Sequence, residues 1–230
     1  MVSALYATVG VMLCLYRRDA KKAGRGQSID VSLLESLYTM LSGHAVVYDQ
    51  LGMPGRRTGS RTAGSAPRNV YRTKDERWIA IAGSTQALTE RLFREMGRPE
   101  LIEDPRFRTN RDRVANVEAL DEIVGAWVAG RTQAECIEQL VNAEVAVAPV
   151  ADFKQLAEDP HLVARKTLVT IDDPDLGTLR MPDVLPKLSE TPGRIRFAGL
   201  PMGVHNDEIY RDRLGLTDAG IRALQADGTI

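Results

Sequence analysis

The sequence has few of the residues that build metal sites and disulfide frameworks. It contains two cysteines, Cys14 and Cys136, and three histidines in 230 residues. The cysteines lie far apart, and neither belongs to a CxxC motif or to a Cys/His spacing typical of zinc ligands. We therefore expect no metal site and no disulfide, and the free thiols favour the reducing cytoplasm as the location.

The chain also lacks a surplus of either charge and a long apolar run. Lys and Arg number 30 and Asp and Glu number 31, so the formal net charge of −1 gives no reason to expect nucleic acid or an anionic membrane as a partner. The uncharged segment from Met1 to Tyr16 falls short of the ~20 residues that cross a bilayer. A helix that is apolar on all sides must be buried. We expect its packing partners to lie upstream of this sequence.

Glycines, prolines and charged clusters predict the order of the first elements. Ser28 to Ser32 alternates as a short strand does, and a helix is expected to follow as far as Leu51. The segment from Gly52 to Pro67 has no apolar periodicity and predicts a loop. The β-rich runs Asn69 to Thr73 and Trp78 to Ala82, separated by four charged residues, predict a hairpin.

Apolar residues at intervals of three and four predict helices after this hairpin, at residues 85–96, 110–129 and 132–142. The carboxylates from Glu118 to Glu144 lie at helical surface spacing and need no chemical role. A second hairpin is expected around Asp175, Leu176 and Gly177, and two further helices are expected near the end of the chain.

These patterns predict an α/β protein that includes an α+β small domain. Residues 1–51 are expected to be the helical part of a large domain, and residues 52–68 a glycine-containing loop or linker. The small domain is predicted at 69–184, distinct from the opening and closing helices. Residues 185–230 are expected to form a linker and C-terminal helices that return to the large domain.

Four segments, in this order and spacing, resemble the class III coenzyme A transferases, the CaiB/BaiF family that includes formyl-CoA transferase. They are Gly24–Glu35, Asn69–Asp75, Asp104–Phe107 and Gly203–Ile209, so the resemblance covers nearly the whole chain. It implies a nucleotide-binding-like large domain, a small domain and an interlocked homodimer. Acyl-CoA and carboxylic acids are the implied substrates, with no permanently bound cofactor.

The resemblance implies an aspartate as nucleophile on the acyl-CoA thioester. A positioned, partly dehydrated carboxylate suits this chemistry because acyl anhydrides and thioesters interconvert readily. Counting back from Gly10 along the first helix places this aspartate one residue before Met1. We therefore expect no catalytic nucleophile in the chain, which would be a carboxy-terminal part that is inactive alone.

The loop holds the candidate site residues that the resemblance assigns, namely Gly59, Ser60, Arg61 and Gly64. They occupy the place of the family's glycine-rich loop, which closes over the aspartyl intermediate, stabilises oxyanions and excludes water. The alternative is a plain interdomain linker. The arginines of this loop could pair with a substrate carboxylate or a CoA phosphate, or could form a solvated cluster. Leu33 matches a position that contacts CoA in the family, and its alternative role is core packing.

Two other functions stay open at this stage. The racemase branch of the family, α-methylacyl-CoA racemase, places a glutamate shortly after the strand that matches Trp78 to Ala82. This chain has Thr85 in that region, and a threonine cannot act as the acid or base, so transfer is favoured over racemisation. The other alternative is a non-catalytic remnant or an assembly partner.

Overall fold

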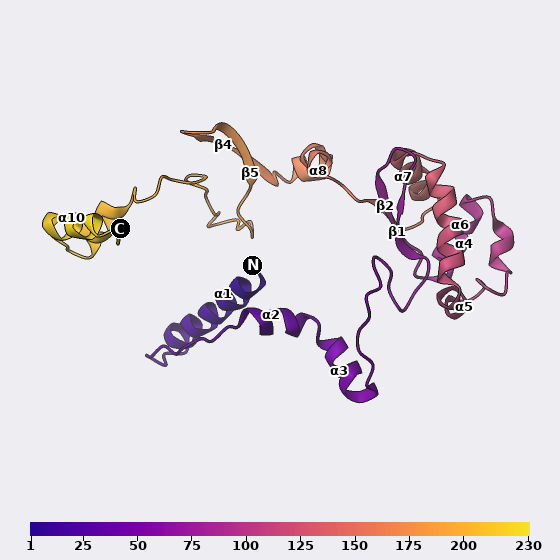
Figure 1. Cartoon of the computed structure of the whole chain (residues 1–230), viewed down its shortest axis with the longest axis horizontal. Helices are drawn as coiled ribbons and strands as arrows, with labels where there is room; N and C mark the ends of the chain where they lie inside the picture. The colour runs from indigo at the N-terminus through magenta and orange to yellow at the C-terminus, as the bar shows by residue number, and fades with distance from the viewer.

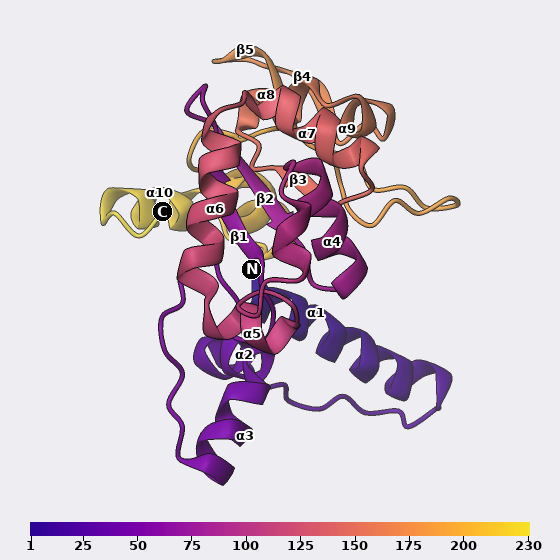
Figure 2. The same cartoon turned by 90° about the vertical axis from the view of Figure 1, so that its right-hand side faces the viewer.

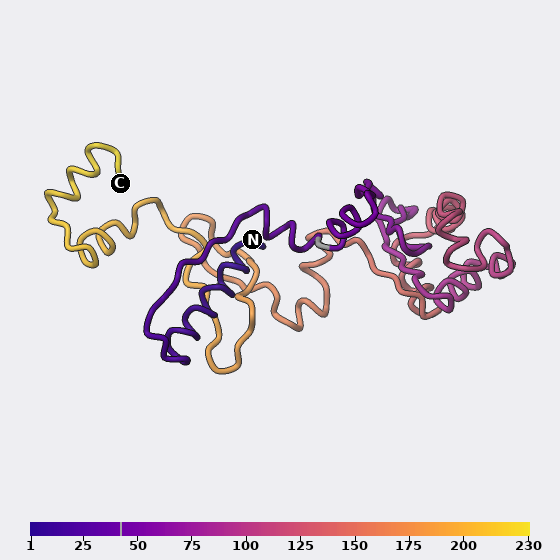
Figure 3. The backbone as a smooth tube through the Cα atoms, turned by 90° about the horizontal axis from the view of Figure 1, so that it is seen from below, coloured from indigo at the N-terminus to yellow at the C-terminus, as the bar shows by residue number. Residues whose placement is uncertain are grey.

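A compact unit between Ala66 and Val147 contains most of the buried apolar residues of the protein. The computed structural model describes residues 1–41 and 43–230. The compact unit lies at one end of the molecule and the C-terminal helices at the other, as Figures 1 and 3 both show. Helices and strands alternate irregularly along the chain, which gives the mixed α/β fold expected from the sequence.

Helix α1 (Val2–Leu15) confirms the predicted first helix, and a π-helical turn continues it from Tyr16 to Ala20. None of its residues is buried, and Leu5 and Leu13 are 67% and 63% exposed. The helix packs beside the chain that leads into α2 (Leu33–Met40), where Gly10 leaves room for the side chain of Ile29. A Cβ added at Gly10 would lie 3.2 Å from Ile29 Cγ2.

The segment before α2 and the helix after it differ from the prediction. Ser28 to Ser32 form no strand, because no neighbouring segment in the described part of the chain offers them a hydrogen-bonding ladder. The single helix expected as far as Leu51 is divided into α2 and α3 (Ser42–Leu51). Leu41, with φ −99° and ψ 16°, leaves the helical conformation between them.

The predicted first hairpin is confirmed. Strands β1 (Arg68–Arg72) and β2 (Trp78–Ala82) are antiparallel, and β3 (Val147–Pro149) pairs with the other edge of β2. The register places Val70 opposite Ala80 and Tyr71 opposite Ile79. Successive side chains of a strand point to opposite faces. Tyr71, Ile79 and Ile81 therefore share one face of the sheet, and all three are buried. Helices of the same unit pack against the strands (Figure 2).

Four helices build the rest of the compact unit: α4 (Gln86–Glu95), α5 (Asn110–Ala115), α6 (Val117–Ala129) and α7 (Gln133–Asn142). Threonine hydroxyls cap three of them, with Thr109 and Thr132 in full capping boxes. The helix predicted over 110–129 is divided at Asn116, whose side chain donates to the carbonyl oxygen of Asp112 at 2.9 Å.

The remaining elements follow the compact unit. They are α8 (Phe153–Glu158), α9 (Pro160–Ala164), β4 (Leu168–Asp173), β5 (Gly177–Pro182), a π-helical segment (Asp207–Arg213) and α10 (Asp218–Ala226). The compact unit itself also contains a short 3-10 helix (Pro99–Ile102). The second predicted hairpin is confirmed, since β4 and β5 pair antiparallel with each other as a separate sheet. The limits 69–184 of the small domain stay a prediction.

In the described part of the chain, every helix is too short or too polar to cross a membrane.

Candidate functional site

The loop before β1 contains a tight turn that requires a glycine. Arg61 N–H donates to the carbonyl oxygen of Thr58 at 3.3 Å, and the Thr58 hydroxyl donates to the carbonyl oxygen of Arg61 at 3.0 Å. Gly59 within this turn has φ +64°, a left-handed conformation that side chains other than glycine rarely adopt. Gly64 has no such φ, and a Cβ added there would meet nothing within 4 Å. Of the two predicted loop glycines, only Gly59 is demanded by the backbone.

The C-terminal end of the loop is fixed to the compact unit by α5. Arg113, which is fully buried, donates from Nε to the carbonyl oxygen of Ala66 at 2.7 Å and from Nη1 to the carbonyl oxygen of Phe107 at 3.0 Å. The side chain of Asn110 donates to the carbonyl oxygen of Gly64 at 3.0 Å. Burial lowers the pKa of Arg113 from its ordinary value. These bonds attach the loop to the helical layer.

Asp121 on α6 fastens the middle of the loop. Its carboxylate accepts from Arg61 Nε at 2.6 Å, from Asn69 Nδ2 at 2.8 Å and from the Tyr71 hydroxyl at 2.6 Å. Asp121 is 9% exposed, and the side chain of Arg61 is 34% exposed. Burial of Tyr71, together with the hydrogen bond to the Asp121 carboxylate, raises the pKa of the phenol above its ordinary value. The buried carboxylate therefore joins the predicted loop, the first strand and a core helix.

Sequence reasoning missed Asp121, and its assignment to a solvated helix surface was wrong. The signal was available in the pattern of α6. Val117, Val124 and Val128 recur on the helix face that packs on the core, and Asp121 occupies the same face between them. A lone carboxylate on an apolar stripe must be paired, because an unpaired buried charge is costly.

A cavity of about 310 Å³ lies between the loop and the start of α6. Arginine, hydroxyl and small apolar side chains line it: Arg57, Thr58, Arg61, Thr62, Ala63, Ser65, Ala66, Val114 and Val117. Arg61 thus contacts Asp121 on one side and the cavity on the other. The lining offers positive charge, the hydroxyl of Thr62 and small apolar side chains, which suits a small anionic molecule.

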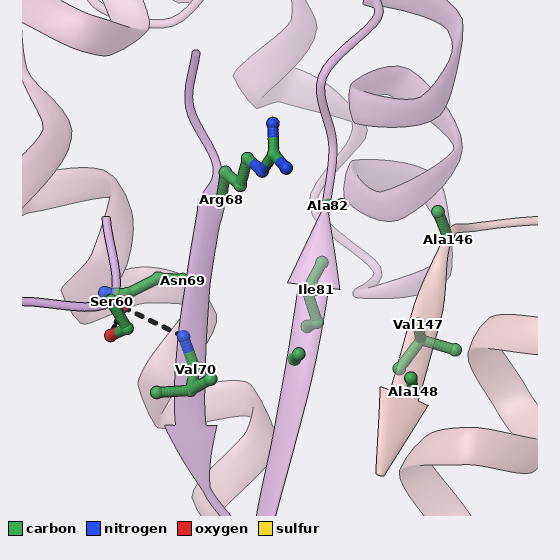
Figure 4. Close-up of a pocket in the computed structure, with 10 residues that line it drawn as sticks. Ser60, Arg68, Asn69, Val70, Ile81, Ala82, Ala146, Val147 and Ala148 are labelled. Atoms are coloured by element: carbon green, nitrogen blue, oxygen red, sulfur yellow. Dashed lines mark hydrogen bonds between the residues drawn. The ribbon is translucent and has the colours of Figure 1, made fainter. Parts of the chain in front are cut away.

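A second cavity of about 360 Å³ lies along the three-stranded sheet and is bordered by the loop residue Ser60 (Figure 4). Small apolar residues of β1, β2 and β3, such as Val70, Ala80 and Ala148, form its floor, and Arg68 and Ser60 lie at its edges. The Ser60 hydroxyl donates to the side-chain oxygen of Asn69. Ser60 and Arg61, although adjacent in sequence, therefore line different cavities.

The remaining predicted residues lie elsewhere. Leu33 is the first residue of α2, is 75% exposed and lines neither cavity. The Thr85 hydroxyl caps α4 by accepting from Leu88 N–H at 3.3 Å, which gives this threonine a structural role. Among the described residues, no three histidine, cysteine, aspartate or glutamate side chains gather as metal ligands would.

Comparisons with known proteins identify relatives along the whole chain. The sequence profile of CoA-transferase family III matches residues 1–206. The chain is 37% identical over 231 residues to the beta subunit of succinyl-CoA–L-malate CoA-transferase from Chloroflexus aurantiacus, covering 100% of this chain and 56% of that protein. It is 33% identical over 229 residues to succinyl-CoA–D-citramalate CoA-transferase from the same organism, again covering 100% of this chain and 56% of the relative.

The fold has a match among solved structures. A crystal structure of a CaiB/BaiF family protein from Brucella suis superposes with a TM-score of 0.77 at 23% identity, covering 92% of this chain and 54% of that one. The chain thus spans about half the length of the curated relatives and of the solved structure that it matches.

Proposed function

The chain belongs to CoA-transferase family III, and we propose that the protein moves coenzyme A between short dicarboxylic acids. The observation that carries this proposal is the family match over residues 1–206. The two relatives from Chloroflexus are named for succinyl-CoA with L-malate or D-citramalate, and each of these acids carries a second carboxylate. The arginine-lined cavity beneath the loop suits a small substrate of this kind.

The proposed reaction transfers coenzyme A from a donor acid to an acceptor acid through an enzyme aspartate. An aspartate attacks the thioester carbonyl of the donor, which forms a mixed anhydride and releases the CoA thiolate. The thiolate attacks the aspartyl carbonyl, so the donor acid leaves as a carboxylate and aspartyl-CoA remains. The acceptor carboxylate then attacks the aspartyl thioester, which forms a second mixed anhydride and releases the CoA thiolate. The thiolate attacks the acceptor carbonyl of this anhydride, so acceptor-CoA forms and the aspartate carboxylate is restored.

Within this reaction we assign the loop around Gly59 and Arg61 to the acyl site. Water would hydrolyse the anhydride and the aspartyl thioester, so a loop that covers them favours transfer over hydrolysis. The left-handed turn at Gly59 and the bond from Arg61 to Asp121 hold the loop against the compact unit. Backbone N–H groups of such a loop can stabilise the oxyanions that form at each acyl transfer.

We further propose that the nucleophilic aspartate lies outside these 230 residues, directly before α1, and that the chain alone does not transfer CoA. The carboxylates nearest to α1 in sequence, Asp19 and Asp30, follow its far end, and Asp19 is paired with Arg18. The homodimer and the cytoplasmic location inferred from the sequence stay predictions. Racemisation finds no support at Thr85, since its hydroxyl caps a helix.

The test is to trap the acyl-enzyme. The 230-residue chain, and a version extended into the coding sequence upstream of Met1, are incubated with succinyl-CoA and hydroxylamine. Mass spectrometry then searches for an aspartyl hydroxamate. We expect the modification only in the extended protein, at the carboxylate preceding α1. A hydroxamate on a residue of the chain itself would show that the nucleophile has been misplaced.

A further inference from the structure

We propose that Arg61, with Arg57 beside it, binds the carboxylate of the substrate that is not joined to coenzyme A. This inference rests on the proposed function, because it names the group of the dicarboxylic acid that the loop cavity recognises. The ligand is defined by its chemistry as a short aliphatic dicarboxylate.

Three features support this proposal, and the first is the geometry of Arg61. Its Nε donates to Asp121 at 2.6 Å, so one edge of the guanidinium is committed to the protein. The two Nη groups make no hydrogen bond with any residue that the structure describes, although Arg61 lines the cavity. A planar guanidinium carries five N–H donors in a fixed fork that matches a carboxylate. Arg61 is therefore held by one edge while four donors stay available to a ligand.

The second feature is the local charge. Asp121 neutralises Arg61, so this pair alone gives the cavity little net attraction for an anion. Arg57 supplies the additional positive charge, since it lines the same cavity and makes no ion pair with a described residue. The hydroxyl group of Thr62 adds a neutral donor, whereas the hydroxyl of Thr58 already donates to the carbonyl oxygen of Arg61. Together these groups can replace the water around one carboxylate, which favours its binding in the cavity.

The third feature is the shape of the cavity. Val114 and Val117 give the cavity an apolar part, against which a chain of a few methylene carbons can pack. The volume of about 310 Å³ lies at the lower end of the range for small-molecule sites, about 300–1,000 Å³. A short acid fits this space, whereas the whole of coenzyme A is too large for it. Asp121 acts here as a positioning residue, because it fixes the plane in which Arg61 presents its donors.

Two-dimensional ¹H–¹⁵N NMR of the 230-residue chain tests the proposal without requiring catalysis. The probes are succinate, succinamide as the uncharged analogue of the same length, and adenosine 3′,5′-bisphosphate as the phosphate-bearing fragment of the coenzyme. We expect saturable shifts of the amides of residues 57–65 with succinate alone. Arg61→Gln should weaken succinate binding at least about tenfold, the loss of a charge-assisted hydrogen bond. Arg61→Lys, which keeps the charge without the fork, should restore part of it.

The control variant is Arg68→Gln, which removes an arginine that lines the other cavity and should leave succinate binding unchanged. Absence of a saturable response to succinate, or an equal response to succinamide, would overturn the proposal. Preferential binding of adenosine 3′,5′-bisphosphate would overturn it too, by assigning the arginines to a CoA phosphate. Arg57→Gln provides a second variant with the same expected direction if Arg61→Gln disturbs the loop. Succinate binding with no CoA transfer by the extended protein would refute only the proposed function.

Discussion

Replacing Asp121 by alanine should destabilise the compact unit by about 2–4 kcal/mol. The main cost comes from Tyr71, because the variant leaves its buried hydroxyl without an acceptor, which costs about 1–3 kcal/mol. Asn69 and Arg61 are partly exposed and can turn to water, so each of their lost bonds contributes less than about 1 kcal/mol. Adding Tyr71→Phe to Asp121→Ala should recover part of the loss, because the stranded hydroxyl is then absent.

Urea unfolding followed by tryptophan fluorescence measures this effect in the relevant region. The protein has two tryptophans, Trp78 and Trp127, and both lie in the compact unit. The matched control is Asp104→Asn, which weakens a partly exposed ion pair with Arg106 at 2.7 Å and should cost less stability than Asp121→Ala. Asp121 does not have this role if Asp121→Ala lowers the free energy of unfolding by less than about 0.5 kcal/mol, or by no more than the control does.

Three further predictions follow from individual residues. The raised pKa of Tyr71 means that the folded state keeps the phenolic proton when the unfolded chain loses it, so stability should fall as pH rises above about 10. Urea midpoints at about pH 9 and about pH 11 should show this fall, and Tyr71→Phe should reduce it. Burial raises the pKa of Cys136 to about 11, so a thiol reagent at about pH 8 should modify half-buried Cys14 in the folded protein and Cys136 only after unfolding. Rapid labelling of both thiols would contradict this. Gly59→Ala should strain the turn by about 1 kcal/mol and speed tryptic cleavage of the loop, whereas Gly64→Ala should not. Equal cleavage of the two variants would show that the positive φ of Gly59 does not matter for the turn.

The parts of the fold that the sequence predicted are those that local chemistry decides. Four charged residues between two β-rich runs are enough to predict the hairpin of β1 and β2, and apolar spacing is enough to predict α4, α6 and α7. Gly43 stands two residues after the break at Leu41, but a single glycine inside a helical pattern is tolerated, so the pattern predicted one helix where there are two. The segment from Ser28 to Ser32 alternates correctly and still forms no strand, because a strand also needs a neighbour.

The site was only partly accessible from the sequence. Family resemblance led to the loop residues Gly59 and Arg61, but the partner of Arg61 is 60 residues away in the chain. That pairing depends on how α6 packs on β1, which no local pattern reveals. The difference between Gly59 and Gly64 is likewise a matter of backbone dihedral angle, and both residues look the same in a sequence.

The most direct test of the central claim is transfer itself. The extended protein is incubated with succinyl-CoA and ¹³C-labelled malate, and the CoA esters are separated and identified by mass spectrometry. We expect the extended protein to form labelled malyl-CoA and free succinate in equal amounts, and the 230-residue chain alone to form no labelled ester. Hydrolysis of succinyl-CoA without a labelled ester, or transfer by the 230-residue chain alone, would contradict the claim.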